Sequence, residues 1–288
     1  MDKREFVLNN VIKKIGLPVQ RQAIQAGNVR THFLLAGKGE PVILIHGGDS
    51  GAGAVRWYPV IASLAKCFQV IAPDVVGYGE TDKPWAAYDR PYFATWLGAF
   101  IKTLGIQGVN LVGHSAGGAI ALHFALEHPE SIERLVLVNA AGLGAGTQSV
   151  PASTKLRMIW QNLFPSREGS LWWLEQQVLA DGAKPDDTML EVEDYGAEVV
   201  RGSGGRRVFW LGRGRIVAPL AMESMACIEA PTLFIWGEKD MNFPISMAQE
   251  ACALMPHARL ETIRDAGHNC YYDQPGLVVD ALTGFLEE

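Results

Sequence analysis

The chain has 288 residues, of which 48% are hydrophobic, enough to bury the core of one large domain or two modest ones. Its formal charge is −6, and the sequence contains neither a run of basic residues nor an acidic tail. We therefore expect a globular protein, and we do not expect nucleic acid or another polyanion as its partner.

The spacing of the cysteines and the length of the apolar runs indicate in which cellular compartment the protein is expected. The cysteines and histidines show no CxxC pair and no spacing typical of metal ligands, so we expect free thiols and no bound metal. The cysteines are Cys67, Cys227, Cys252 and Cys270. The N-terminal segment has no uninterrupted apolar run of signal-peptide length, and no segment approaches the roughly 18 apolar residues of a membrane span. These features predict a cytoplasmic protein without a membrane partner.

Residues 1–18 are predicted to form an N-terminal arm. Apolar residues recur there at helical spacing and lie on one side of the predicted helix. They are Phe6, Val7, Val11, Ile12 and Ile15. Such a face could pack on the body of the protein or on a second subunit, so the sequence leaves a homo-oligomer open.

The next elements predict a sheet. Two strand-like runs, 19–26 and 30–36, flank the turn Gly27-Asn28 and predict an antiparallel hairpin at a sheet edge. Later runs are apolar throughout, as are strands buried on both faces of a parallel sheet. They span 41–45, 68–72, 109–112, 135–138 and 232–236. Helical patterns alternate with them, at 54–66, 91–104 and 117–128. The chain is therefore predicted to have a mostly parallel, doubly wound α/β fold in a mixed sheet.

The pattern changes between Leu143 and Pro219, where strand-like runs disappear and helix-like segments alternate with glycine-rich turns. We interpret 143–219 as a helical cap inserted into a core made of 19–142 and 220–288. The glycines that open this segment lack the spacing of a dinucleotide-binding loop, and no cofactor is expected.

Gly113-His114-Ser115-Ala116-Gly117 fits the G-x-S-x-G pattern, directly after a strand-like run and directly before a helical one. A strand that turns sharply into a helix holds its serine in a strained backbone conformation at the helix N-terminus, where the helix dipole favours negative charge. We predict that Ser115 is a nucleophile.

A serine nucleophile needs a base, and His268 is the best candidate. It lies in a loop after the strand-like run 259–263, at the edge of the sheet where a loop can reach Ser115. Other histidines fit structural positions better, on the early strand, on the helix behind the elbow or in a turn. They are His32, His123, His128 and His257.

The third member of such a triad is a carboxylate that orients the imidazole and stabilises its charged form. Asp240 follows the strand-like run 232–236 and is our candidate. Glu238, two residues earlier, is the competing acid, and Asp265 is too close to His268 in the chain to orient its ring. The order Ser115, Asp240, His268 is that of the α/β-hydrolase fold.

Two further groups complete the predicted site. Gly47 and Gly48 follow the run 41–45, and we assign the oxyanion hole to the backbone N–H groups of Gly48 and Ala116. Gly47, His114 and the aromatic residues of the cap are the candidate lining of an apolar substrate pocket. The aromatic residues are Trp160, Trp172, Trp173 and Trp210.

Over roughly 30–142 and 228–287 the chain resembles the α/β-hydrolase superfamily. The shared motifs are HGG, DVVGYGET, GHSAGG, WGEKD and AGHN. HGGDSGAG and YGETDKP resemble cofactor-free carboxylesterases and the meta-cleavage-product hydrolases, which cut a carbon–carbon bond in dienoate ring-fission products. The latter usually carry GNSMGG and a tryptophan after the catalytic histidine, where this chain has GHSAGG and Asn269. These hydrolases also bind the carboxylate of the substrate with an arginine, and the stretch LEVEDYGAE, where it would be sought, lacks one. Haloalkane dehalogenases and epoxide hydrolases of this fold use an aspartate nucleophile, so Ser115 argues against both.

We therefore expect a serine hydrolase that cleaves apolar carboxylic esters through an acyl-enzyme, with a small molecule as its partner. The alternatives are a carbon–carbon bond hydrolase of the meta-cleavage-product type and a lactonase. A catalytically silent receptor or scaffold of the same fold is the non-enzymatic alternative.

Overall fold

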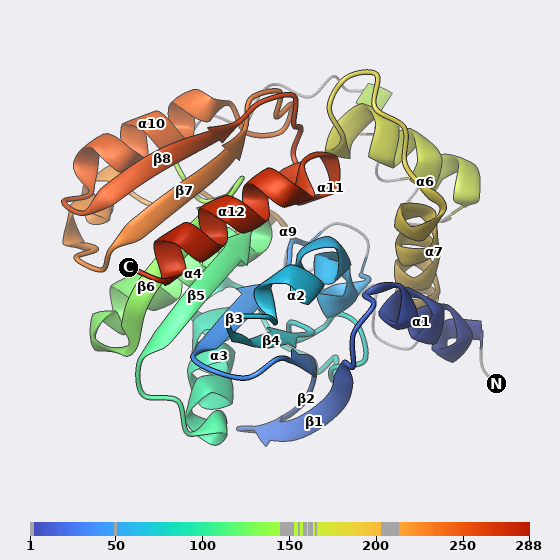
Figure 1. The fold of residues 1–288 in the computed structure, drawn as a ribbon, viewed down its shortest axis with the longest axis horizontal. Coiled ribbons are helices and arrows are strands. Elements are labelled where there is room, and N and C mark those ends of the chain that lie inside the picture. Colours follow the sequence, from blue (N-terminus) through green and yellow to red (C-terminus); the bar gives the residue numbers. More distant parts are fainter. Residues whose placement is uncertain are drawn as a thin grey trace.

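The computed structural model describes residues 3–48, 51–144, 153–154, 156–157, 160, 164, 166–202 and 213–288. Within them, one eight-stranded sheet runs through the centre in the order β1-β2-β4-β3-β5-β6-β7-β8 (Figure 1). The strands are β1 Gln20–Ala26, β2 Val29–Ala36, β3 Pro41–Ile45, β4 Gln69–Pro73, β5 Val109–His114, β6 Ile132–Val138, β7 Thr232–Gly237 and β8 Ala258–Ile263. The β1–β2 hairpin joins β4 antiparallel, and the other strands pair parallel. The predicted fold class, a mixed but mostly parallel α/β sheet, is confirmed.

Helices cover both faces of this sheet. Those before residue 140 are α1 Lys3–Lys14, α2 Tyr58–Leu64, α3 Arg90–Leu104 and α4 Ala116–Glu127, with 3-10 turns η1 Gly53–Trp57 and η2 Pro129–Ser131. The later ones are α6 Arg167–Trp173, α7 Asp187–Arg201, α9 Arg213–Ile216, α10 Ile245–Leu254, α11 Cys270–Asp273 and α12 Pro275–Leu286, with the π turn η3 Leu174–Val178 and the 3-10 turn η4 Met222–Cys227. None of the described helices is long and apolar enough to cross a membrane.

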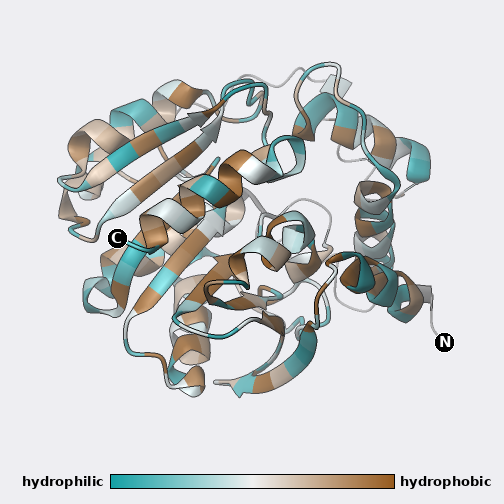
Figure 2. Ribbon diagram, in the orientation of Figure 1, coloured by the Kyte–Doolittle hydropathy of each residue, from teal (hydrophilic) through white to brown (hydrophobic). Residues whose placement is uncertain are grey.

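Side-chain alternation along the strands builds two cores. Ile43 and Leu111 point to the face covered by α3, α4 and α10, while Leu44 and Val112 point to the face covered by α2 and α12. In Figure 1, α2 and α12 lie in front of the sheet. Hydrophobic and hydrophilic segments alternate along α12 and α1, as expected of helices that cover a core (Figure 2). The continuous apolar runs of the sequence are thus explained by burial on both sides.

Local signals set several boundaries. The Asp89 side chain accepts the N–H of Tyr92 and caps α3, which ends at Gly105 with φ 73°. The helix predicted at 54–66 is instead a 3-10 turn followed by the shorter helix α2. Gly53, at φ 76°, begins this turn against the Asp74 carboxylate, which accepts the N–H of Ala54 at 2.7 Å. The contact with Asp74 shapes this turn. It joins residues far apart in the chain, so the helical pattern of the sequence does not reveal it.

Helix α1 lies alongside α7 (Figure 1). Leu8 and Val11 are buried against Val192 and Val199. The predicted contact face is wrong at Phe6, whose side chain is 50% exposed. Leu8, which lies one turn before Ile12, replaces Phe6 in the interface because the contact stripe is rotated from the predicted one.

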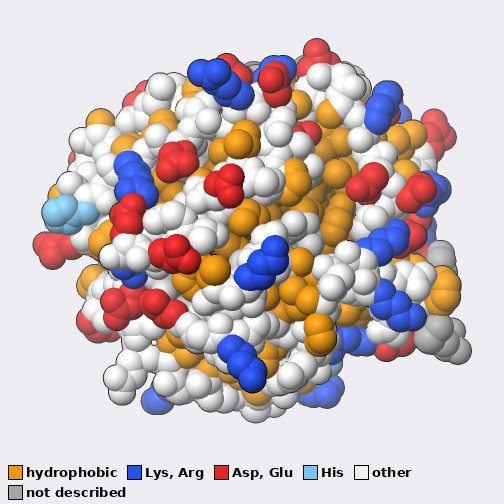
Figure 3. Space-filling model, viewed as in Figure 1, with side chains coloured by type: hydrophobic (Ala, Val, Ile, Leu, Met, Phe, Trp, Pro, Cys, Tyr) orange, Lys and Arg blue, Asp and Glu red, His pale blue; other side chains and the backbone are white. Residues whose placement is uncertain are grey.

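Helices α6, α7 and α9 lie between residues 143 and 219, and the described part of that range contains no strand. The domain boundaries at residues 18, 142 and 219 stay predictions. On the face drawn in Figure 3, acidic and basic side chains are scattered without a broad basic patch.

Candidate active site

Ser115 lies at the turn between β5 and α4 with φ 52° and ψ −120°. Its N–H donates to the carbonyl of Val138 at 3.1 Å, and its carbonyl accepts the N–H of Ala141 at 2.9 Å. A Cβ atom on Gly113 would lie 2.5 Å from the carbonyl oxygen of Gly117, and one on Gly117 would collide with the carbonyl of Ile45. Glycine is therefore required on both sides, and the strained serine is held by the neighbouring strand.

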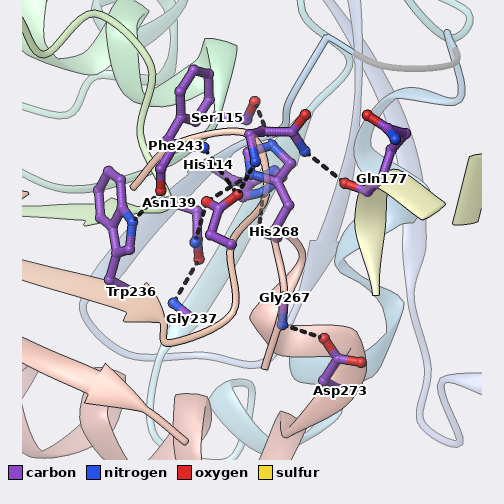
Figure 4. Close-up of polar contacts among 12 residues, drawn as sticks. His114, Ser115, Asn139, Gln177, Trp236, Gly237, Phe243, Gly267, His268 and Asp273 are labelled. Carbon is purple, nitrogen blue, oxygen red and sulfur yellow. Dashed lines mark hydrogen bonds and ion pairs between the residues drawn. The ribbon is translucent and has the colours of Figure 1, made fainter. Parts of the chain in front are cut away.

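His268 bridges the serine and an acid, as Figure 4 shows for the serine side. Its Nε2 lies 3.0 Å from Ser115 Oγ, and its Nδ1 lies 3.0 Å from Asp240 Oδ2. His268 is 3% exposed and Asp240 is 6% exposed. A carboxylate at Nδ1 favours the tautomer with the proton on Nδ1, which leaves Nε2 free to accept the Ser115 proton.

The Asp240 carboxylate is held from both sides. Its Oδ1 accepts the N–H groups of Asn242 at 2.8 Å and Phe243 at 3.1 Å. Burial alone would raise the pKa of Asp240, but the charge of His268, the hydrogen bond from His268 and the other donors outweigh burial and lower this pKa. Asp240 therefore stays ionised and can stabilise an imidazolium.

The competing acid, Glu238, and Asp265, which the sequence had set aside, both lie away from His268 Nδ1. Glu238 is exposed, and Asp265 is exposed and forms an ion pair with Lys239 at 2.6 Å. The structure thus brings Ser115, His268 and Asp240 together.

Asn139 is a site residue that the sequence reasoning missed. It follows β6, is fully buried and has φ 42°. Its Nδ2 donates to Asp240 Oδ2 at 2.6 Å, and its Oδ1 accepts the N–H of Gly237 at 3.3 Å. The available signal was its position at the carboxyl end of a parallel strand, beside the strand that carries the acid.

The glycine loop after β3 lies against the elbow. A Cβ on Gly47 would be 3.1 Å from Ser115 Cβ, and one on Gly48 would be 3.3 Å from Ala116 Cβ. The His46 ring fixes this loop, because its Nε2 accepts the N–H of Val75 at 3.0 Å and its Nδ1 lies 2.7 Å from the Gly47 carbonyl. Nδ1 therefore carries the proton and donates it to Gly47. The predicted oxyanion donors therefore lie next to Ser115.

His114 differs from the expected pocket residue. Its side chain is fully buried, with Nε2 3.2 Å from the His268 carbonyl and Nδ1 3.3 Å from Tyr271 Oη. A carbonyl only accepts, so His114 Nε2 donates to it and Nδ1 accepts from Tyr271. His114 supports the His268 loop from behind instead of lining an open pocket.

The tryptophans of the predicted cap lie in different environments. Trp173 is buried in the core on the sheet face that α2 and α12 cover, and the Arg157 guanidinium lies 4.4 Å from the Trp172 ring. Trp160 is 64% exposed and packs on Phe164, and Trp210 lies outside the described residues. A pocket role for these tryptophans stays a prediction.

A strained serine elbow within a doubly wound sheet, joined to a histidine and a buried aspartate, defines the class of α/β hydrolases. Residues 40–191 and 175–275 match the profile of the α/β hydrolase fold family. The chain therefore belongs to this family.

Several named hydrolases are similar to this chain. The chain is 36% identical to 2-hydroxy-6-oxo-2,4-heptadienoate hydrolase of Pseudomonas putida, over 97% of this chain and 99% of the relative. It is 34% identical to 2-hydroxy-6-oxo-6-(2'-aminophenyl)hexa-2,4-dienoic acid hydrolase of Metapseudomonas resinovorans, over 91% and 89%. The crystal structure of a serine hydrolase involved in carbazole degradation matches with a TM-score of 0.81 and 31% identity, over 94% and 99% of the two chains. Family and relatives together support a hydrolase.

Proposed function

We propose that the chain is a serine hydrolase in which Ser115 is the nucleophile, His268 the general base and Asp240 the acid that orients it. The observation that carries this proposal is the continuous contact from Ser115 Oγ through His268 to Asp240, with both distances at 3.0 Å. Such distances are within the reach that proton transfer needs.

In this mechanism Ser115 Oγ attacks the substrate carbonyl carbon while its proton passes to His268 Nε2. The N–H groups of Gly48 and Ala116 are proposed to bind the oxyanion. As the tetrahedral intermediate collapses, the leaving alcohol takes the proton from Nε2 and an acyl-enzyme remains. His268 then accepts a proton from water, whose oxygen attacks the acyl carbon, and the acid product and free Ser115 result.

Apolar carboxylic esters are our first candidate substrates. Their cleavage requires only the nucleophile, base and oxyanion donors together with an apolar wall. Phe243 supplies part of such a wall, because its ring centroid lies 5.3 Å from that of His268.

Cleavage of a 2-hydroxy-6-oxo-dienoate is the second candidate, and the similarity to hydrolases of such compounds favours it. A dienoate also presents a carboxylate, for which arginine is well suited. The arginines at 157–201 whose side chains are described contact other groups: Arg157 lies over Trp172, Arg167 pairs with Asp194, and Arg201 pairs with Glu198. Arg206 and Arg207 lie outside the described residues.

A side-by-side measurement of kcat/KM on p-nitrophenyl butyrate and on a 2-hydroxy-6-oxo-hepta-2,4-dienoate tests the assignment. We expect faster ester cleavage, and Ser115→Ala should lower both rates by roughly a thousandfold or more. A tenfold or greater preference for the dienoate would favour the second candidate. Absence of turnover together with absence of fluorophosphonate labelling would indicate a silent scaffold.

A further inference from the structure

The loop that carries His268 follows an edge strand. β8 ends the strand order, so β7 is the only strand beside it in the described sheet. On its other side, this loop contacts residues 177–180, which we call the 177–180 segment. That segment begins inside the π turn η3, in which the N–H of Leu179 donates to the carbonyl of Leu174 at 2.9 Å. π turns occur frequently at functional sites.

Backbone groups of the loop meet backbone groups of this segment directly. The N–H of Asn269 donates to the carbonyl of Val178 at 3.1 Å. A Cβ on Gly267 would lie 2.5 Å from the carbonyl carbon of Leu179, so only glycine permits this approach. Asn242, whose N–H binds Asp240, also donates its Nδ2 to the carbonyl of Gln177 at 2.6 Å.

Asp273 on α11 joins the two parts. Its Oδ2 accepts the N–H of Gly267 at 2.7 Å and the N–H of Ala180 at 3.1 Å. The dashed line from Gly267 to Asp273 in Figure 4 marks the first of these bonds, one residue before His268. Asp273 is half-buried and does not touch Ser115 or Asp240 through any contact among the described residues.

We propose that Asp273 is a positioning residue for His268, which it holds within reach of Ser115 by joining Gly267 to Ala180. The inference rests on the proposed function, in which His268 is the base. A carboxylate can accept two N–H donors at once, and without this bridge the loop loses the contact that fixes Gly267, one residue before His268, although its other hydrogen bonds remain. Displacement of a catalytic group by about 1 Å can cost on the order of a hundredfold in rate.

The test compares Asp273→Ala and Asp273→Asn with Asp265→Asn. Asp265 is a matched control because it lies in the same loop but is exposed and pairs with Lys239. For each variant we would measure kcat and KM on a p-nitrophenyl ester and the end-point stoichiometry of fluorophosphonate labelling.

We expect Asp273→Ala to lower kcat by about tenfold or more, with KM within about twofold and a labelling end point equal to that of the wild type. The kcat of Asp273→Asn should lie between those of Asp273→Ala and the wild type, because the amide retains one acceptor oxygen. The kcat of Asp265→Asn should match that of the wild type. A merely structural role would instead lower kcat and the labelled fraction in proportion.

A wild-type kcat in Asp273→Asn and Asp273→Ala, or a loss that follows the labelled fraction, overturns the inference. If Asp273→Ala does not fold, Asp273→Asn decides. The proposed function fails separately, by activity of Ser115→Ala, which does not depend on any Asp273 variant.

Discussion

Helix α7 carries two adjacent acidic residues in opposite environments. Glu193 pairs with Arg56 at 2.5 Å, and the two side chains are 3% and 1% exposed. Asp194 pairs with Arg167 at 2.7 Å, and those side chains are 30% and 57% exposed. The two pairs have similar geometry and differ in burial, so together they isolate the effect of burial on an ion pair.

Glu193→Gln keeps the shape of the side chain but removes the Glu193 charge from beside the buried Arg56 guanidinium. Breaking a buried pair in this way costs about 3 to 5 kcal/mol, whereas an exposed pair contributes about 0 to 1 kcal/mol. The entropy of unfolding at about 2.1 cal/mol/K per residue gives about 0.6 kcal/mol/K for 288 residues. Glu193→Gln should therefore lower Tm by about 5 to 8 °C, and Asp194→Asn by less than about 2 °C.

Urea unfolding of both variants would measure the two losses as changes in the free energy of unfolding. The double variant Arg56→Met with Glu193→Leu removes both charges and should regain most of the loss, because neither buried charge then remains. Equal losses for Glu193→Gln and Asp194→Asn would refute the reasoning from burial, as would a double variant less stable than Glu193→Gln.

Other predictions address the site and its supports. Asp240→Asn should lower kcat by roughly 10³- to 10⁴-fold, while Glu238→Gln should change it little. Steady-state kinetics showing the reverse would assign the role of the acid to Glu238. Gly267→Ala should cost about 1 to 3 kcal/mol in urea unfolding and lower kcat, because its Cβ meets the Leu179 backbone; an unchanged protein would contradict this contact. Burial raises the pKa of Asp74 to about 6, although hydrogen bonds from the N–H groups of Ala54 and Glu80 act to lower this pKa. The folded state therefore binds this proton more tightly than the unfolded state does. The stability of the wild type relative to Asp74→Asn should fall by about 2 kcal/mol between pH 4 and pH 7, and a constant difference across these pH values would contradict the raised pKa.

The sheet and the three candidate catalytic positions could be predicted because each leaves a local pattern. Strands buried on both faces are continuous apolar runs, and the sharp elbow needs small residues on either side of Ser115. Asp240 and His268 are found by their place after a strand, in the order that the fold imposes.

Asn139 leaves only its place at the carboxyl end of β6, and Asp273 leaves no such pattern. Their roles depend on which backbone N–H or carboxylate lies opposite after folding, and the neighbouring sequence does not encode that partner. The mistake at Phe6 has a similar origin, because a short amphipathic helix permits several contact stripes, and the partner helix α7 selects the one that contains Leu8.

The segment between β6 and β7 touches the core on both sides of the site. From α7, Glu193 holds Arg56 in the turn η1, which begins five residues after Gly48 in the loop that carries the proposed oxyanion donor. From the π turn onwards, residues 177–180 hold the loop of the proposed base. A helix that only covered a pocket would need neither a buried ion pair nor backbone contacts with these loops. The two attachments instead connect the loop of His268 and the glycine loop to the same segment between β6 and β7, so substitutions in it are expected to change kcat as well as substrate preference.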